Sequence, residues 1–275
     1  MVETALRDTL ALPLGVALVV AGLAWLAGVR RRGLAGALGI AAGFAAGATA
    51  VTGVPRFPPV GAVEKVAWLG LLGLGGGLVA ARMPDARWRG LVFAASAAVG
   101  VAWLGWARLG VPHMAAWLAG GLIVAAATWA LVRATAPGGP SRELAALTGV
   151  AALTAAVVGV YGSSYALAQL VAVLAAALGG VLLMTGWRGR ALGPAAHGAA
   201  LVPLAGLVTI LALYTRAEPL GLLLLVPVLM AGLVRTAVLG DGTKARHHAA
   251  TAGFALLPAG VAVMVAVARS PELYM

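Results

Sequence analysis

The stretch LALPLGVALVVAGLAWLAGV at residues 10–29 holds no charged residue, and Arg30, Arg31 and Arg32 follow it directly. An apolar helix of about 20 residues spans the hydrocarbon of a bilayer. The run ends at the arginines because a guanidinium is costly to place in hydrocarbon. Basic residues beside a span also favour its cytoplasmic end. This stretch therefore predicts a membrane-crossing helix whose Arg30 end faces the cytoplasm.

The composition extends this prediction to the whole chain. Of 275 residues, 62% are hydrophobic and 10% are charged, whereas soluble domains are about half apolar and a quarter charged. Only helices and closed barrels cross a membrane, because every backbone polar group needs an internal partner. The apolar runs are continuous and do not alternate as barrel strands do. We therefore expect an all-α, polytopic membrane helix bundle.

Arginine recurs along the chain, and Arg30, Arg82, Arg133, Arg188 and Arg235 each close an apolar run. The pattern predicts about ten transmembrane helices arranged as five hairpins. Residues 1–275 are expected to form a single integral membrane domain with no soluble domain, because the loops are short. A duplicated hairpin and a merely regular spacing of helices both remain open. The predicted helices are Leu10–Val29, Gly33–Thr52, Ala62–Ala81, Gly90–Ala107, Pro112–Val132, Glu143–Tyr161, Ser164–Trp187, Ala195–Tyr214, Pro219–Leu239 and Ala249–Ala268.

The charges of the loops predict the orientation. One set of loops carries 13 basic and 3 acidic residues, and the other carries 6 basic and 5 acidic residues. The positive-inside rule places the first set in the cytoplasm, so both termini are expected on the non-cytoplasmic side of a cell inner membrane. The abundance of Arg, Ala and Gly suggests a prokaryotic source. The predicted cytoplasmic anchors are Arg30, Arg31, Arg32, Arg82, Arg133, Arg188 and Arg235.

Several classes of function are not supported by the residues. The net charge of +11 forms no basic face with interleaved aromatics, so we expect no nucleic-acid partner. The chain has no cysteine, which excludes disulfides and thiolate sites. The four histidines do not pair at one depth, so no haem, other cofactor or metal is expected. No carboxylate lies at the middle of a predicted span, which argues against a proton relay.

Polar residues gather at the predicted outer ends of the helices, where they suggest a site for an anion or an acidic lipid headgroup. In the alternative interpretation they are ordinary loop ends, with Glu64 and Glu218 neutralised by arginines. A hydrolase would require Ser163 or Ser164 to meet His113, although the serines more simply cap a helix. The candidate outer-face polar cluster is Arg56, Glu64, Lys65, Arg108, His113, Tyr161, Ser163, Ser164, Gln169, Tyr214, Arg216 and Glu218.

Proline and glycine predict how the helices bend and pack. Pro203, Pro227 and Pro258 lie inside late spans, where they are candidate kinks, either functional hinges or static bends. Gly43 and Gly47, like Gly73 and Gly77, lie four residues apart. In lipid, small residues at this spacing allow helix backbones to approach closely. We therefore expect a compact bundle.

Three functions remain open: a carrier or channel for a small solute or lipid-like molecule, a non-catalytic subunit or scaffold of a larger membrane complex, and, least favoured by the residues, a lipid-modifying enzyme that uses the outer polar cluster. The lipid bilayer is the expected partner, with anionic lipid, a membrane protein or a second copy as further candidates. The chain is similar to drug/metabolite-type transporters in length and helix count, but its predicted terminal side is opposite, so no family is assigned. A cavity lined by Tyr161, Gln169, Thr209 or Tyr214 would favour transport.

Overall fold

The computed structural model describes residues 2–29, 33–108, 114–136, 139, 141–187, 192–239 and 244–269. All regular secondary structure in these ranges is helical, which confirms the all-α prediction. The elements are α1 (Val2–Leu6), η1 (Arg7–Ala11, a π-helical turn), α2 (Leu12–Leu26), α3 (Leu34–Thr52), α4 (Ala62–Arg82), α5 (Ala86–Gly105), η3 (Trp106–Arg108), α6 (Met114–Ala134), α7 (Ser141–Tyr161), α8 (Tyr165–Trp187), α9 (Pro194–Tyr214), α10 (Pro219–Leu223), α11 (Leu225–Leu239) and α12 (Lys244–Ala268).

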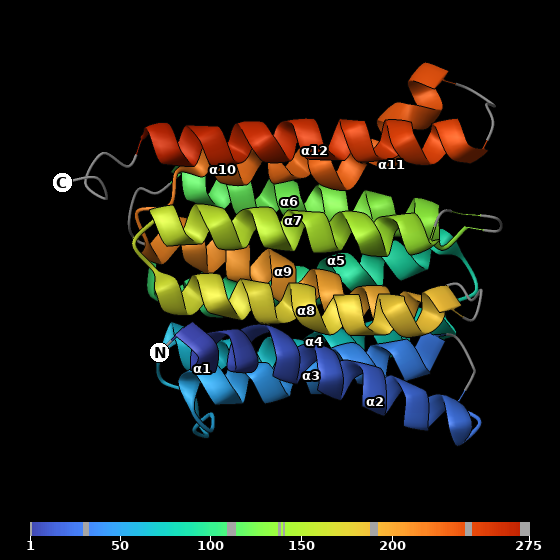
Figure 1. The fold of residues 1–275 in the computed structure, drawn as a ribbon, viewed down its shortest axis with the longest axis horizontal. Coiled ribbons are helices and arrows are strands. Elements are labelled where there is room, and N and C mark those ends of the chain that lie inside the picture. The colour runs from blue at the N-terminus through green and yellow to red at the C-terminus, as the bar shows by residue number, and fades with distance from the viewer. Residues whose placement is uncertain are drawn as a thin grey trace.

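The helices run side by side along the long axis of the molecule (Figure 1). Within the described ranges, nine helices are long and apolar enough to cross a membrane. α10 and α11 follow one another along α12, and their apolar stretch Pro219–Gly232 is shorter than those nine. The protein is therefore a multi-pass membrane helix bundle, as predicted. Its first and last helices, α1 and α12, begin and end at the same end of the bundle, on the left in Figure 1.

Helix boundaries agree with the prediction within a few residues, except at three starts. The first helix begins at Val2 instead of Leu10, the fourth at Ala86 instead of Gly90, and the last at Lys244 instead of Ala249. In each case the helix continues into charged residues, because helix formation needs backbone hydrogen bonds and not an apolar side chain. Apolar length sets where a helix enters hydrocarbon, whereas the helix itself extends into the polar interface.

Helix α9 is the centre of the bundle. Among the described residues it contacts α3, α4, α5, α6, α7 and α8, which form a ring around it. Its apolar stretch is 94% buried. Within this ring α6 and α7 make the least contact with each other, and α11 packs against both. α2 lies outside the ring against α3 and α8, and α12 lies outside it against α7 and α11. The chain thus has a closed core and two flanks.

Glycines allow the closest helix approach, between α4 and α9. A Cβ atom added to Gly77 would lie 2.7 Å from the carbonyl oxygen of Ala195, and one added to Gly198 would lie 2.6 Å from the Cα of Gly77. A Cβ on Gly73 would lie 2.6 Å from the carbonyl oxygen of Gly198. The backbones are therefore in direct contact, as the spacing of Gly73 and Gly77 predicts. A similar contact joins α3 to α2, where Gly43 meets the carbonyl oxygen of Pro13.

The three late prolines differ in their local structure. α9 runs without interruption through Pro203, and α12 runs through Pro258. The segment from Pro219 to Leu239 instead breaks at Leu224, between α10 and α11. Pro227 explains this break, because its ring excludes a helical hydrogen bond to the carbonyl of Leu223, four residues earlier. The break shortens α11 and leaves α10 as a separate turn.

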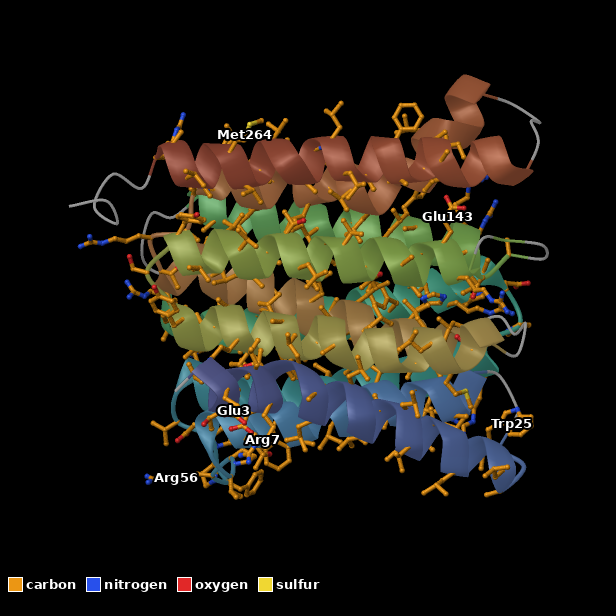
Figure 2. The ribbon with its side chains drawn as sticks, in the orientation of Figure 1. Glu3, Arg7, Trp25, Arg56, Glu143 and Met264 are labelled. Atoms are coloured by element: carbon orange, nitrogen blue, oxygen red, sulfur yellow. The ribbon has the colours of Figure 1, made fainter. Side chains whose placement is uncertain are left out.

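Two names describe the ends of the bundle. The arginine end holds the α4–α5 and α6–α7 connections with Arg82 and Arg133, and the tyrosine end holds Tyr161 and Tyr214. Figure 2 places Arg56 at the tyrosine end and Glu143 toward the arginine end. Arg82 and Arg133 are exposed, and the Arg133 guanidinium lies 5.5 Å from the centre of the Trp129 ring. The predicted anchors Arg30, Arg31, Arg32 and Arg188 lie outside the described residues.

Candidate functional site

A depression at the tyrosine end lies beside the last turns of the central helix. Its volume is about 610 Å³. It is bounded by the start of α4, the short helix η3, the turn between α7 and α8, and the chain that follows α9. Its polar lining residues are Arg108, Ser163, Ser164, Tyr214, Thr215 and Arg216. Its apolar lining includes Val63, Leu167, Ile210 and Leu213.

Arg108 and Tyr214 form one wall of this depression. The Tyr214 hydroxyl donates a hydrogen bond to the carbonyl of Leu104 at 3.0 Å, which fixes the ring against α5. The guanidinium carbon of Arg108 lies 5.1 Å from the centre of that ring. This cation–π contact orients the arginine without neutralising it. The sequence places these residues 106 positions apart, and the packing of α5 against α9 brings them together.

The turn between α7 and α8 forms the opposite wall. Ser163 adopts a left-handed backbone conformation with φ of 62°. The backbone N–H of Arg216 donates to the carbonyl of Gly162 at 3.2 Å, which ties this turn to the chain after α9. Gly162 is required there, since a Cβ atom on it would lie 2.7 Å from Ala217. Ser163, Ser164 and Arg216 are therefore held on a defined surface.

The electrostatics of the depression favour an anion. Two of its lining residues are arginines and none of the described lining residues is acidic. α8 begins at Tyr165, directly after Ser164, so the positive end of its helix dipole adds to the arginine charge. The apolar residues of the lining suit a ligand that also carries hydrocarbon. A negatively charged amphiphile has both of these properties.

Three residues of the predicted outer cluster have other partners. The Glu64 carboxylate accepts hydrogen bonds from the backbone N–H groups of Val60 at 2.9 Å and Gly61 at 3.3 Å, and so caps α4. Lys65 donates to the carbonyl of Trp103 at 3.1 Å. Glu218 forms an ion pair with Arg269 at 2.8 Å, which joins the start of α10 to the end of α12. The alternative interpretation of paired loop charges thus fits Glu218.

Arg56, Tyr161 and Gln169 of the predicted cluster are not among the described residues that line the depression. Arg56 is exposed on the loop between α3 and α4. Tyr161 and Gln169 are half-buried, and neither is among the residues that line the depression. Thr209 is fully buried, and its hydroxyl donates to the carbonyl of Ala205 at 2.8 Å. His113, which a hydrolase would have to bring to Ser163 or Ser164, lies outside the described residues.

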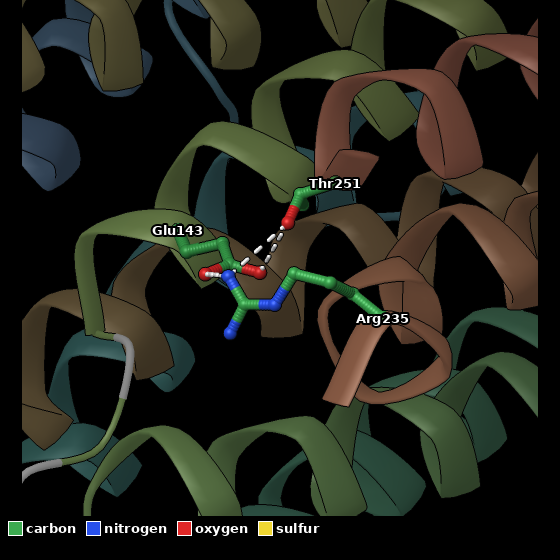
Figure 3. A network of polar contacts seen from close by, with 3 residues as sticks. All are labelled: Glu143, Arg235 and Thr251. Carbon is green, nitrogen blue, oxygen red and sulfur yellow. Dashed lines mark hydrogen bonds and ion pairs between the residues drawn. The ribbon is translucent and has the colours of Figure 1, made fainter. Parts of the chain in front are cut away.

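A second polar group joins three helices near the arginine end (Figure 3). The Arg235 guanidinium on α11 lies 2.9 Å from the Glu143 carboxylate on α7, and their side chains are 12% and 13% exposed. The Thr251 hydroxyl on α12 donates to the same carboxylate at 3.1 Å. A Cβ on Gly232 would overlap the Glu143 carboxylate, so this glycine makes room for that group. Arg235 is also one of the predicted cytoplasmic anchors, and its guanidinium is turned toward Glu143 within the bundle.

A third polar group lies at the arginine end of the central helix. His197 is 2% exposed, and its Nε2 lies 3.4 Å from the Ser141 hydroxyl oxygen. Ser141 donates a hydrogen bond to the carbonyl of Leu192. These contacts connect the start of α7 to the start of α9. They satisfy buried polar atoms and so stabilise the connection.

Sequence reasoning missed both of these groups. Glu143 and Arg235 are 92 residues apart. Only one feature of the sequence could have indicated the pair, namely that these opposite charges lie at similar predicted depths in the membrane. No group of three or more potential metal ligands occurs among His, Asp and Glu of the described residues. In the comparisons with known proteins, no family model, no curated protein and no solved structure matches this chain.

Proposed function

We propose that this multi-pass membrane protein is a carrier for a small organic anion that has an apolar portion. The observation that supports the proposal is the depression at the tyrosine end, where Arg108 and Arg216 flank an apolar floor with no acidic residue in the described lining. Charge-assisted hydrogen bonds from arginine suit carboxylate, phosphate or sulfonate groups. The hydrocarbon part of the ligand would lie against Leu167 and Ile210. The positive-inside bias makes this the non-cytoplasmic side.

Octyl phosphate and its neutral counterpart 1-octanol test the binding step. We expect the purified protein to bind octyl phosphate more tightly than 1-octanol in isothermal titration. The double variant R108Q/R216Q should weaken octyl phosphate binding by about a hundredfold or more, since each of the two lost charged contacts is worth about 1.5–3 kcal/mol. Arg56→Gln is the matched control, because Arg56 is exposed outside the depression. Equal affinity of the double variant and the control would refute the site.

Flux measurements test the carrier role separately. Proteoliposomes loaded with octyl phosphate should take up radiolabelled octyl phosphate faster than protein-free liposomes, and R108Q/R216Q should reduce this exchange while R56Q does not. Binding without any protein-dependent exchange would contradict a carrier and leave only a binding protein.

The packing of the central helix supports a second candidate, a non-catalytic subunit or scaffold. α9 is enclosed by six helices. Two of its buried polar groups, the imidazole of His197 and the hydroxyl of Thr209, already have hydrogen-bond partners. Such a helix presents no unoccupied polar group to a passing solute along these positions. Co-purification in mild detergent distinguishes the candidates: a stoichiometric membrane-protein partner together with absent exchange would favour the scaffold.

A further inference from the structure

A groove with a volume of about 380 Å³ lies between α7 and α12. It begins at Arg142 and Glu143 near the arginine end and runs along Ala146 and Val150 on one side and Thr251 and Leu256 on the other. Its walls beyond the charged end are almost wholly apolar. This volume lies within the range of about 300–1,000 Å³ that is usual for ligand pockets. The groove is separate from the depression at the tyrosine end.

The groove opens toward the hydrocarbon of the membrane. Ala146 and Ala252 are exposed on the outside of the bundle, and Leu256 is 60% exposed. A buried water needs two or more polar partners, which apolar walls do not supply. An unfilled groove would also forfeit dispersion contacts along both helices. The physical expectation is therefore a hydrocarbon chain from the surrounding lipid.

The depth of the groove matches one leaflet. The lining runs along α7 from Arg142 to Val150, which corresponds to about 12 Å at a rise of about 1.5 Å per residue. Half of the hydrocarbon core of a bilayer is about 15 Å thick. An acyl chain whose head lies at the arginine end therefore follows the groove over most of its length in that leaflet.

The charges at the mouth of the groove select the headgroup. The Glu143 carboxylate is already engaged by Arg235 and Thr251. Arg142 also lines the mouth of the groove, and its Nη2 donates a hydrogen bond to the carbonyl of Thr185 at 3.3 Å. Guanidinium pairs well with phosphate. The exposed arginines Arg82 and Arg133 at the same end add a positive field that favours a headgroup with net negative charge.

We propose that the α7–α12 groove binds one acyl chain of an anionic phospholipid whose phosphate lies against Arg142. The bound chain fills the space beside the Glu143–Arg235–Thr251 group and supports α12 against the ring. This inference does not rest on the carrier function, since the groove and the depression share no lining residue.

Photo-cross-linking in vesicles of equimolar phosphatidylglycerol and phosphatidylcholine tests the proposal. The probe is a trace of phosphatidylglycerol with a diazirine in one acyl chain, and mass spectrometry maps the labelled peptides. We expect label concentrated on residues 146–150 and 252–256 in the wild-type protein. Labelling of the lipid-facing surfaces of α2 and α5 that is as strong as the labelling of the groove residues would overturn the proposal. This comparison requires only the wild-type protein.

Variants then test chain and headgroup separately. Ala252→Trp should block the groove and lower its labelling about tenfold, a loss of about 1.4 kcal/mol in binding free energy. Ala98→Trp on the exposed face of α5 is the matched control and should leave the groove labelling unchanged. Arg142→Gln should abolish the preference for the phosphatidylglycerol probe over a phosphatidylcholine probe. Unchanged preference in R142Q, or unchanged labelling in A252W, would contradict the assignment.

Discussion

The α4–α9 contact and the α11–α12 hairpin are held to the bundle in different ways. α4 and α9 meet backbone to backbone through Gly73, Gly77 and Gly198. α11 and α12 lie outside the ring, and Arg235, Glu143 and Thr251 join them to α7. In lipid no water-exclusion force drives helices together, so either close packing of small residues or polar contacts must do so. The core uses the first means and the flank adds the second.

The flank should be the more sensitive to a single substitution. Arg235→Leu leaves the Glu143 carboxylate largely buried without its cation, and breaking such a pair costs about 3–5 kcal/mol. We expect a large fall in thermal stability in detergent, measured by fluorescence-detected gel filtration. The double variant E143L/R235L removes both charges and should recover most of the loss. A double variant as unstable as R235L would mean that shape, and not charge pairing, holds the hairpin.

The core contact should respond to one added methyl group. Gly77→Ala places a Cβ 2.7 Å from the carbonyl oxygen of Ala195, and overpacking of this kind costs about 1–3 kcal/mol. Gly75→Ala on the same helix is the matched control, because nothing lies within 4 Å of its added Cβ. Stability curves from the same detergent assay should separate the two variants. Coincident curves would contradict the close approach of α4 and α9.

The smallest effect is expected at the other end of α12. Glu218 and Arg269 form an ion pair whose side chains are 21% and 60% exposed, and exposed pairs contribute about 0–1 kcal/mol. Glu218→Gln should therefore change the midpoint of thermal unfolding far less than R235L does. A loss as large as that of R235L would show that both ends of the hairpin depend on charge pairing.

The sequence was sufficient to predict the membrane class and nearly all of the helices. Apolar length and flanking arginines specify the spans because hydrocarbon tolerates little else. The sequence was not sufficient to identify α9 as the central helix. A lipid-facing surface and a protein core are both apolar, so the residues of α9 resemble those of the exposed helix α2. Only the helix contacts distinguish them.

The sequence also predicted part of the candidate site, because it indicates how deep a residue lies in the membrane but not which helices are its neighbours. Arg108, Ser163, Ser164, Tyr214 and Arg216 were expected at the outer ends of the helices, and they line one depression. Glu64 belonged to the same predicted cluster, but local geometry makes it a cap of α4. Depth along the membrane can be read from a hydropathy pattern, whereas the neighbours of each helix cannot. Glu143 and Arg235 were therefore placed at similar depths without being recognised as a pair.

Footprinting with a membrane-soluble carbene reagent tests the arrangement of the bundle most directly. The reagent labels side chains that contact hydrocarbon, and mass spectrometry of the native protein in liposomes locates the label. The ring around α9 predicts that residues 198–213 stay almost unlabelled, while α2, with Leu18, Val19 and Leu23 exposed, is labelled heavily. Labelling of α9 at the level of α2 would contradict the enclosed central helix.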